Sequence, residues 1–197
     1  MINHKRTERL YREEGLALRR KRKRKGAAGA RVVLPTAQRP NQHWSMDFVS
    51  DSIVTGRRFR ALTIVDDYSR ECPAIEVDTS LGGVRVVKVL DRLNEVRGLP
   101  EVITVDNGPE FIGKALDDWA YAKGVKLNFI RPGKPIENAY AESCNGRLRD
   151  ECLNTNWFLS LREAREIIEN WREDYNQVRP HSSLNNLTPK EYAEAAV

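Results

Sequence analysis

The chain has 197 residues, of which 40% are hydrophobic and 31% are charged, and its formal net charge is +5. This length accommodates one core domain of about 100 to 150 residues together with appendages. No apolar run approaches the roughly 18 residues that a membrane span requires, and the N-terminus is charged rather than signal-like, so we expect a cytoplasmic protein with no membrane partner.

The positive charge is concentrated at the N-terminus. Residues 1–31 contain 12 Lys or Arg and three Glu, a balance of +9, whereas the rest of the chain carries −4. Seven consecutive basic residues precede the small residues GAAGA, and they are Arg19, Arg20, Lys21, Arg22, Lys23, Arg24 and Lys25. Such a run repels itself unless a polyanion screens it, so we predict a DNA-binding arm; the alternative is a merely solvated tail.

Three strands are predicted after this arm. They cover residues 43–49, 58–69 and 72–77 and follow a linker at residues 32–41. Their β-rich composition and the short turns between them predict an antiparallel meander. In the first strand, alternation places Asp47 on the face opposite three large apolar side chains. These side chains are Trp44, Met46 and Phe48.

Helices and strands then alternate along the chain. The next predicted segments are a helix over residues 82–98, a strand over 101–105, a helix over 109–122 and a strand over 125–130. Apolar residues recur at helical spacing in the first of these helices, at Val86, Val89, Leu90, Leu93 and Val96. The second helix begins at a Pro and precedes a Gly, an asymmetry that is typical of helix boundaries.

The C-terminal part is predicted to be mainly helical. Residues 131–138 contain two Pro and one Gly, so we expect a mobile loop that leads into a helix over residues 137–153. An amphipathic helix over residues 161–175 and an irregular tail over residues 179–189 follow. We expect four apolar residues to dock this last helix on the core, namely Trp157, Leu161, Ile168 and Trp171.

Three acidic residues stand in contexts that suit ligands of a divalent metal. Asp47 lies in the first strand, and Asp106 ends the apolar run EVITV. Glu142 lies in the helix predicted over residues 137–153, and 35 residues separate it from Asp106. Such a set of carboxylates indicates polynucleotidyl transfer. Two of these residues also have a simpler interpretation: Asp106-Asn107-Gly108 is a common turn sequence, and Glu142 is an exposed residue of an ordinary amphipathic helix.

The helix that contains Glu142 has one polar and one apolar face. Asn138, Asn145 and Arg149 share the face of Glu142 by helical spacing, and we predict that all three contact DNA, with Arg149 binding a phosphate near the metals. The opposite stripe is apolar. It consists of Ala141, Cys144, Leu148 and Cys152.

Three segments carry a resemblance to a known family. The runs VDNGPEF, RPGKPIENAYAESCNGRLRDE and YNQVRPHSSLNNLTPKEY resemble the transposases of bacterial insertion sequences of the family numbered three, in their integrase-core reading frame. These transposases belong to the retroviral-integrase superfamily. The resemblance extends from about Gln42 to Tyr192. It implies an α/β, ribonuclease-H-like fold with a five-stranded mixed sheet flanked by helices, and the predicted order of elements agrees with this fold.

The resemblance also implies a reaction and a set of site residues. It makes Asp47, Asp106 and Glu142 a metal-binding catalytic triad that holds two Mg²⁺ or Mn²⁺ ions, with Asp47 bridging both ions, Asp106 binding one and Glu142 the other. Because three carboxylates repel one another by roughly 4 kcal/mol per pair at 4 Å, cations are needed to offset the repulsion. The expected function is metal-dependent cleavage of the 3′ ends of an insertion sequence and strand transfer into target DNA. The expected partners are both DNAs and further copies of the chain.

The implied domain organisation has four parts. Residues 1–31 form the basic arm, as the remnant of a helix-turn-helix region, and residues 32–41 form a linker. Residues 42–155 form the integrase catalytic core, and residues 156–197 form a C-terminal helix and tail packed on that core.

Several alternatives stay open at this point. The chain is alternatively a truncated regulatory product that binds DNA without turnover, or a metal-dependent nuclease of the same fold. Asp66 and Asp67 compete with Asp47 for the metal, although we favour a structural role for Asp66 at its strand end. His181 either touches DNA or supports the tail.

Overall fold

The computed structural model describes residues 13–14, 36–131, 133 and 135–196. The described residues from Thr36 onward form one compact unit. The basic run from Arg19 to Lys25, and most of the rest of the predicted basic arm, lie outside the described residues. The strands are β1 (His43–Ser52), β2 (Arg58–Asp66), β3 (Ala74–Asp78), β4 (Val102–Val105) and β5 (Lys126–Phe129). The helices are α2 (Gly83–Arg97), α3 (Pro109–Ile112), α4 (Lys114–Lys123), α5 (Ala139–Leu148), α6 (Leu161–Gln177) and α7 (Pro189–Glu194).

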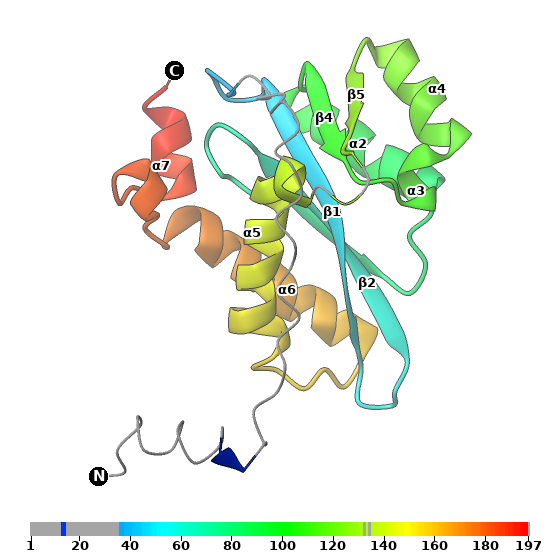
Figure 1. Ribbon diagram of the computed structural model, residues 1–197, viewed down its shortest axis with the longest axis vertical. Helices are drawn as coiled ribbons and strands as arrows, with labels where there is room; N and C mark the ends of the chain where they lie inside the picture. The colour runs from blue at the N-terminus through cyan, green and yellow to red at the C-terminus, as the bar shows by residue number, and fades with distance from the viewer. Residues whose placement is uncertain (1–12, 15–35, 132, 134, 197) are drawn as a thin grey trace. The chain divides into compact units, whose positions relative to one another are not determined.

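A five-stranded mixed sheet lies at the centre of this unit (Figure 1). The strand order is β3-β2-β1-β4-β5. The first three strands along the chain pair antiparallel, as the meander prediction requires, whereas β4 pairs parallel with both β1 and β5. A parallel pair needs a crossover connection, and α3 and α4 supply it between β4 and β5. The predicted sheet is therefore confirmed.

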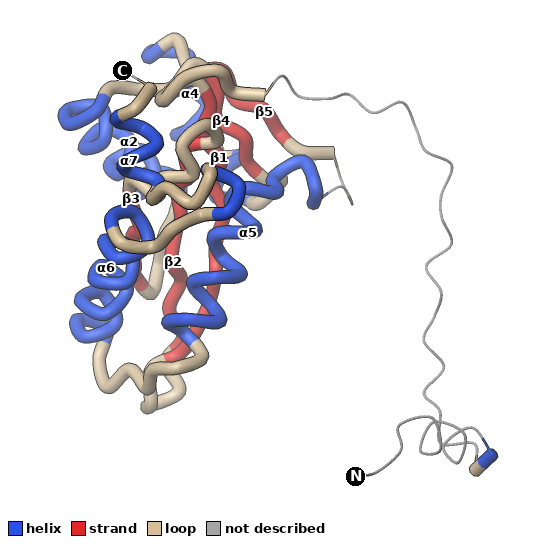
Figure 2. The backbone as a smooth tube through the Cα atoms, turned by 90° about the vertical axis from the view of Figure 1, so that its left-hand side faces the viewer, coloured by secondary structure: helices blue, strands red, loops and turns tan. Residues whose placement is uncertain are grey.

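Helices cover the two faces of the sheet with separate apolar clusters. On one face α2, α3 and α4 pack against β1 and β2, with Trp44, Met46, Leu90, Phe111 and Leu116 among the buried members. On the other face α5 packs against β1 and β2 and α6 packs against β3, with Val49, Phe59, Ala61, Leu148 and Ile168 among the buried members. Figure 2 shows α5 running along the long hairpin of β1 and β2. Alternation along β1 therefore sends Asp47 to the α5 face.

The predicted helices are partly corrected by the structure. The helix predicted over residues 109–122 is two helices, because Gly113 between them has extended backbone angles and glycine is a weak helix former. In α2 four of the five predicted apolar positions are buried, but Val96 is 85% exposed in the last turn. Trp157 is 86% exposed, so it does not dock the C-terminal helix as predicted. Ile168 is buried, and Leu161 and Trp171 pack against the core as expected.

The helix predicted over residues 137–153 also has three parts. It begins with a 3-10 turn, η1 (Pro135–Asn138), continues as α5 and ends in a π-helical turn, η2 (Arg149–Leu153). The segment predicted as a mobile loop before it is described only in part, because residues 132 and 134 lie outside the described residues.

The C-terminal tail contains more structure than predicted. A short 3-10 turn, η3 (Ser182–Leu184), precedes α7. Thr188 and Glu191 form a capping box at the start of α7, in which each side chain accepts from the other residue's backbone N–H. The sequence TPKE carries this signal, with Pro at the first helical position.

The outer edge of β3 is covered by α6 rather than by another strand. Arg165 donates to the Val77 carbonyl at 2.8 Å and Arg172 donates to the Cys72 carbonyl at 3.1 Å. Charged side chains of this kind blunt an edge that otherwise invites pairing with a second chain. Within the described ranges no helix is both long and apolar enough to cross a membrane.

Candidate active site

Asp47 lies on β1, directly opposite Thr63 of β2. Its Oδ1 accepts from the Phe48 N–H at 2.7 Å, and its Oδ2 accepts from Asn145 Nδ2 at 2.9 Å. The Thr63 hydroxyl donates to Asn145 Oδ1 at 2.7 Å. One buried amide on α5 therefore links the carboxylate to both central strands and fixes its orientation.

Asp106 lies where β4 ends, on the strand beside β1. The parallel register pairs Ser45 with Thr104, so two positions further along each chain stand Asp47 and Asp106. Asp106 Oδ1 accepts from the Gly108 N–H at 2.9 Å, and Asn107 Nδ2 donates to the Ile130 carbonyl at 2.7 Å. The segment after β4 is therefore attached to the end of β5. The simpler interpretation, in which Asp106-Asn107-Gly108 is only a turn, does not require this attachment.

Glu142 lies in the first turn of α5 and its side chain is exposed. The start of this helix is held against β1, because Asn138 Nδ2 donates to the Met46 carbonyl at 3.0 Å. Residue 46 directly precedes Asp47 in β1. An acid in the first turn also interacts favourably with the helix dipole. The fold thus presents Glu142 to solvent from an anchored helix end.

Asp47 is affected electrostatically by the other two acids. Burial raises the pKa of Asp47, and the negative charges of Asp106 and Glu142 raise it further, although the hydrogen bonds from Phe48 and Asn145 act in the opposite direction. Asp106 and Glu142 are therefore close enough for their charges to act on Asp47, and the role of the three residues as a metal-binding triad stays a prediction. Among the residues that the structure describes, no three His, Cys, Asp or Glu side chains are grouped closely enough to bind one ion together.

Two of the predicted DNA contacts have a different environment from the one expected. Asn138 and Asn145 share a helix side with Glu142, but they are only 2% and 8% exposed and donate to the Met46 carbonyl and to Asp47, respectively. In the structure these amides hold α5 and Asp47 in place, and their contact with DNA stays a prediction. Helical spacing alone could not distinguish a DNA contact from a contact within the protein, because the sheet covers part of this side of α5.

Arg149 matches its prediction more closely. Its side chain is exposed at the end of α5, and its only described contact is a long one, 3.5 Å from Nη2 to the Ser50 carbonyl. The guanidinium therefore has donors available for a phosphate. Its role as a DNA contact stays a prediction, as does that of the basic run from Arg19 to Lys25.

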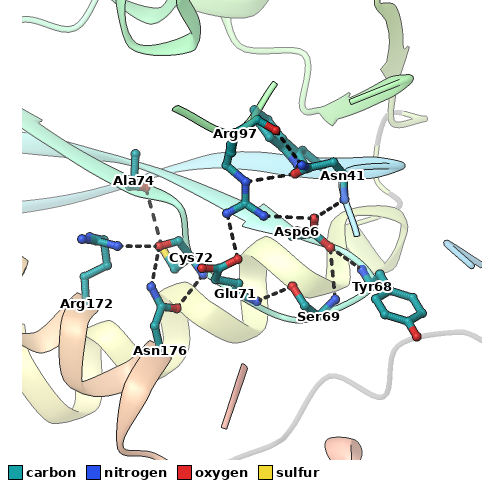
Figure 3. Close-up of polar contacts among 11 residues, drawn as sticks. Asn41, Asp66, Tyr68, Ser69, Glu71, Cys72, Ala74, Arg97, Arg172 and Asn176 are labelled. Atoms are coloured by element: carbon teal, nitrogen blue, oxygen red, sulfur yellow. Dashed lines mark hydrogen bonds and ion pairs between the residues drawn. The ribbon is translucent and has the colours of Figure 1, made fainter. Parts of the chain in front are cut away.

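Asp66 has the structural role that was favoured for it (Figure 3). Its side chain is fully buried and accepts from the backbone N–H groups of Asn41, Tyr68 and Ser69 at 2.7, 2.9 and 3.1 Å. The Arg97 guanidinium lies 3.6 Å away and also donates to Asn41 Oδ1. These contacts tie the end of β2 to the end of α2 and leave Asp66 no free oxygen for a metal.

The C-terminal segment is attached through α6. Asn176 accepts from the Cys72 N–H at 2.8 Å and donates to the Cys72 carbonyl at 2.9 Å, as Figure 3 shows. His181 is buried with its ring edge-on to Tyr175, the centroids being 4.8 Å apart. The alternative in which His181 supports the tail is thus confirmed.

The fold and this site define a class of protein. A mixed five-stranded sheet flanked by helices is the ribonuclease-H-like architecture of retroviral integrase catalytic cores. The chain resembles the HTLV-2 integrase catalytic core domain in complex with magnesium, in its trimeric form, with a TM-score of 0.63 and 18% identity. The match covers 79% of this chain and 98% of that one.

Sequence comparison identifies the family. Residues 37–135 match the Integrase core domain family, and residues 123–189 match a second family of the same description. The chain is 53% identical over 191 residues to the 31.7 kDa protein of insertion element IS407 from Burkholderia multivorans, covering 97% of this chain and 69% of that protein. It is 46% identical to the 39.2 kDa protein of insertion element IS476 from Xanthomonas euvesicatoria, covering 98% of this chain and 56% of that protein.

The chain therefore belongs to the integrase core domain family, and its relatives are proteins of insertion elements. The resemblance expected from the three sequence runs is confirmed at this level. The numbered family of insertion sequences stays a prediction. The chain spans 56% of the length of the second relative, so that protein has further residues outside the matched region.

Proposed function

We propose that this chain is the catalytic part of an insertion-sequence DNA transposase, which cuts the 3′ ends of its element and joins them to target DNA. The observation that carries this proposal is the placement of three carboxylates on β1, at the end of β4 and on α5 of an integrase-core fold. The charges of Asp106 and Glu142 both act on Asp47. Neither a simple turn at Asp106 nor an ordinary surface helix at Glu142 accounts for this convergence.

The carboxylates suit two divalent cations. Carboxylate oxygens are preferred ligands of Mg²⁺ and Mn²⁺. With the ions bound, Asp47 would be a ligand of both, Asp106 of one and Glu142 of the other. Two such ions about 3.5 to 4 Å apart stabilise the attacking and leaving oxygens of a displacement at phosphorus.

The residues around the triad would hold it in place for two successive reactions. Asn145 and the Phe48 N–H orient Asp47, and the Gly108 N–H orients Asp106. Water first attacks the phosphorus that joins the element's 3′ end to the flanking DNA and displaces the element's 3′ oxygen, which leaves a 3′-hydroxyl on the element and a 5′-phosphate on the flank. That hydroxyl then attacks a target phosphate and displaces the target's 3′ oxygen. The route needs no Ser or Tyr nucleophile on the protein.

The same proposal specifies partners and location. The substrates are transposon ends and target DNA, which we expect Arg149 and the basic residues 19–25 to contact through phosphates. Joining two ends in one event requires more than one catalytic centre, so we infer that copies of the chain assemble on DNA. A reaction on the bacterial chromosome takes place in the cytoplasm, at the nucleoid.

A strand-transfer assay tests the proposal. The full chain is incubated with Mg²⁺, a pre-cut DNA end of its own element and a plasmid target, and we expect joined products. Asp47→Asn, Asp106→Asn and Glu142→Gln should each lower the joining rate at least about 100-fold, because each removes a metal-binding charge, while DNA retention on a filter is kept. Lys190→Gln, on α7, serves as the control.

The other outcomes separate the alternatives. Nicking without joining favours a nuclease, and DNA retention without any product favours a regulatory DNA-binding protein. Near-normal joining by any one triad variant contradicts the assignment of that residue.

A further inference from the structure

An ion pair beside Asp106 joins strand β2 to helix α3. Arg60 of β2 donates through Nη1 to Glu110 Oε1 in the first turn of α3. The two side chains are 32% and 17% exposed, so water screens this pair less than it screens a typical surface pair. Partial burial raises the pKa of Glu110, but the hydrogen bond and charge of Arg60 outweigh it and hold the pKa below its usual value.

Two aromatic rings complete the contact. The Arg60 guanidinium carbon lies 4.0 Å from the centroid of the Phe48 ring, within the range of a cation–π interaction. Phe48 in turn stacks on Phe111, with centroids 5.1 Å apart and planes at 26°. Phe48 directly follows Asp47, and Phe111 directly follows Glu110. A closed set of contacts therefore connects the strand of Asp47 to the segment that begins at Asp106.

Gly108 shows how closely Glu110 approaches the site. A Cβ atom added at Gly108 would lie 2.9 Å from Asp106 Oδ1 and 3.1 Å from Glu110 Oε2. Since Gly108 has backbone angles of −66° and 146°, which any residue adopts, a side chain at this position would be limited by space and would displace the two carboxylates. Both carboxylates thus pack over one glycine, and Glu110 is a fourth acid next to the triad.

We propose that Arg60 and Glu110 are positioning residues for the reaction proposed above. Their ion pair, seated on Phe48 and Phe111, holds the segment 106–111 against β1 and neutralises Glu110 beside Asp106. This inference rests on the proposed function for its catalytic consequence. Its structural part, the attachment of the segment, is independent of that function.

Loss of the pair has a distinctive effect. Without Arg60, Glu110 contributes an uncompensated negative charge next to Asp106, and the segment loses its attachment to β2. Both changes disturb the geometry of Asp106, whereas neither removes a contact to DNA. We therefore expect the rate constant kcat to fall about 10- to 100-fold, as for other residues that orient metal ligands, while KM for DNA stays near the wild-type value.

The test compares four variants of the full chain with the wild type. Arg60→Gln and Glu110→Gln break the pair, and Arg60→Glu combined with Glu110→Arg reverses it. Arg162→Gln is the matched control, because it breaks an exposed Arg162–Glu166 pair of 3.0 Å on α6. Strand-transfer kcat and KM are measured with Mg²⁺. Amide hydrogen exchange is followed at Phe111 and Ile112, whose N–H groups donate to the Gly108 carbonyl at 3.0 Å.

We expect Arg60→Gln and Glu110→Gln each to lower kcat and to speed hydrogen exchange at these amides. The reversed pair should largely restore both properties. Arg162→Gln should match the wild type. Faster exchange in Arg60→Gln supports the attachment of the segment to β2, whether or not the wild type joins DNA. A wild type that joins no DNA contradicts only the proposed function. Exchange and kcat equal to those of Arg162→Gln overturn the inference. Faster exchange with unchanged kcat in an active wild-type background also overturns the positioning role.

Discussion

Asp67 is a buried acid that the proposed reaction does not use. Its carboxylate accepts from the Ser45 hydroxyl at 2.6 Å, and the side chain is almost fully buried at the end of β2. Burial raises the pKa of Asp67 to about 7, and the neighbouring Asp66 adds to this effect, whereas the Ser45 hydrogen bond and Arg70 lower it. Asp67 is therefore protonated in the folded protein under mildly acidic conditions in which a free Asp is ionised.

This shift predicts a pH-dependent stability. The folded state binds the Asp67 proton more tightly than the unfolded chain, in which the pKa of Asp is about 4. Protonation of Asp67 therefore contributes its full stabilisation of the fold below that pH, and this contribution is lost as the pH rises to about 7. Relative to Asp67→Asn, the wild type should lose at most about 1.4 kcal/mol of unfolding free energy per pH unit within this window. Urea denaturation of both proteins across the window checks this. Parallel pH profiles would show that Asp67 titrates normally.

At the level of single residues, the sequence allowed the three acids to be predicted because each stands in a recognisable run. The protein partners of two amides, the Met46 carbonyl for Asn138 and Asp47 for Asn145, were not predicted. Asn138 and Asn145 lie on the side of the helix that carries Glu142, and the sequence does not reveal how far the sheet extends under that side. The ion pair between Arg60 and Glu110 was not predicted, because residues 50 positions apart give no local pattern.

Helix α5 combines an exposed acid with a buried amide that orients a second acid on the sheet. Asn145→Ala removes this amide, so Asp47 Oδ2 loses its donor and the Thr63 hydroxyl loses the nearer of its two acceptors, the other being the Asp47 carbonyl at 3.2 Å. We expect the joining rate to fall about 10- to 100-fold, because the orientation of a ligand is lost. We also expect a loss of about 1 to 3 kcal/mol in unfolding free energy, because buried polar groups are left unpaired.

Kinetics and urea denaturation of Asn145→Ala give both quantities. Asn156→Ala is the control, since its amide donates only to groups in the loop after α5, the Cys152 carbonyl at 2.8 Å and the Thr155 hydroxyl at 3.2 Å. A joining rate for Asn145→Ala equal to that of the control contradicts the role of this amide.

At the level of elements, hydrophobic periodicity predicted most of the strands and helices, because each buries one face. It failed where another effect determined the backbone. Gly113 separates α3 from α4, the helix after the triad ends in a π-helical turn, and α7 is set by the Thr188 capping box instead of an apolar stripe. Trp157 was wrongly placed in the core because its apolar character says nothing about the direction of its loop.

In the whole molecule, the site depends on contacts between segments that are distant in sequence. The parallel pairing of β1 with β4 brings Asp47 and Asp106 to neighbouring strand positions, and the packing of α5 on β1 and β2 adds Glu142. The resemblance to a known family predicted this convergence, and the residue spacing alone did not. The basic residues 19–25 lie outside the described part of the chain, so their DNA-binding role stays a prediction.

The most direct test of this account is anomalous diffraction from crystals of the protein grown with Mn²⁺. We predict two peaks on the α5 side of the sheet, about 3.5 to 4 Å apart, one between Asp47 and Asp106 and the other between Asp47 and Glu142. Crystals of Asp47→Asn should show neither peak at full occupancy. Manganese bound only elsewhere, or peaks unchanged by this substitution, would contradict the account.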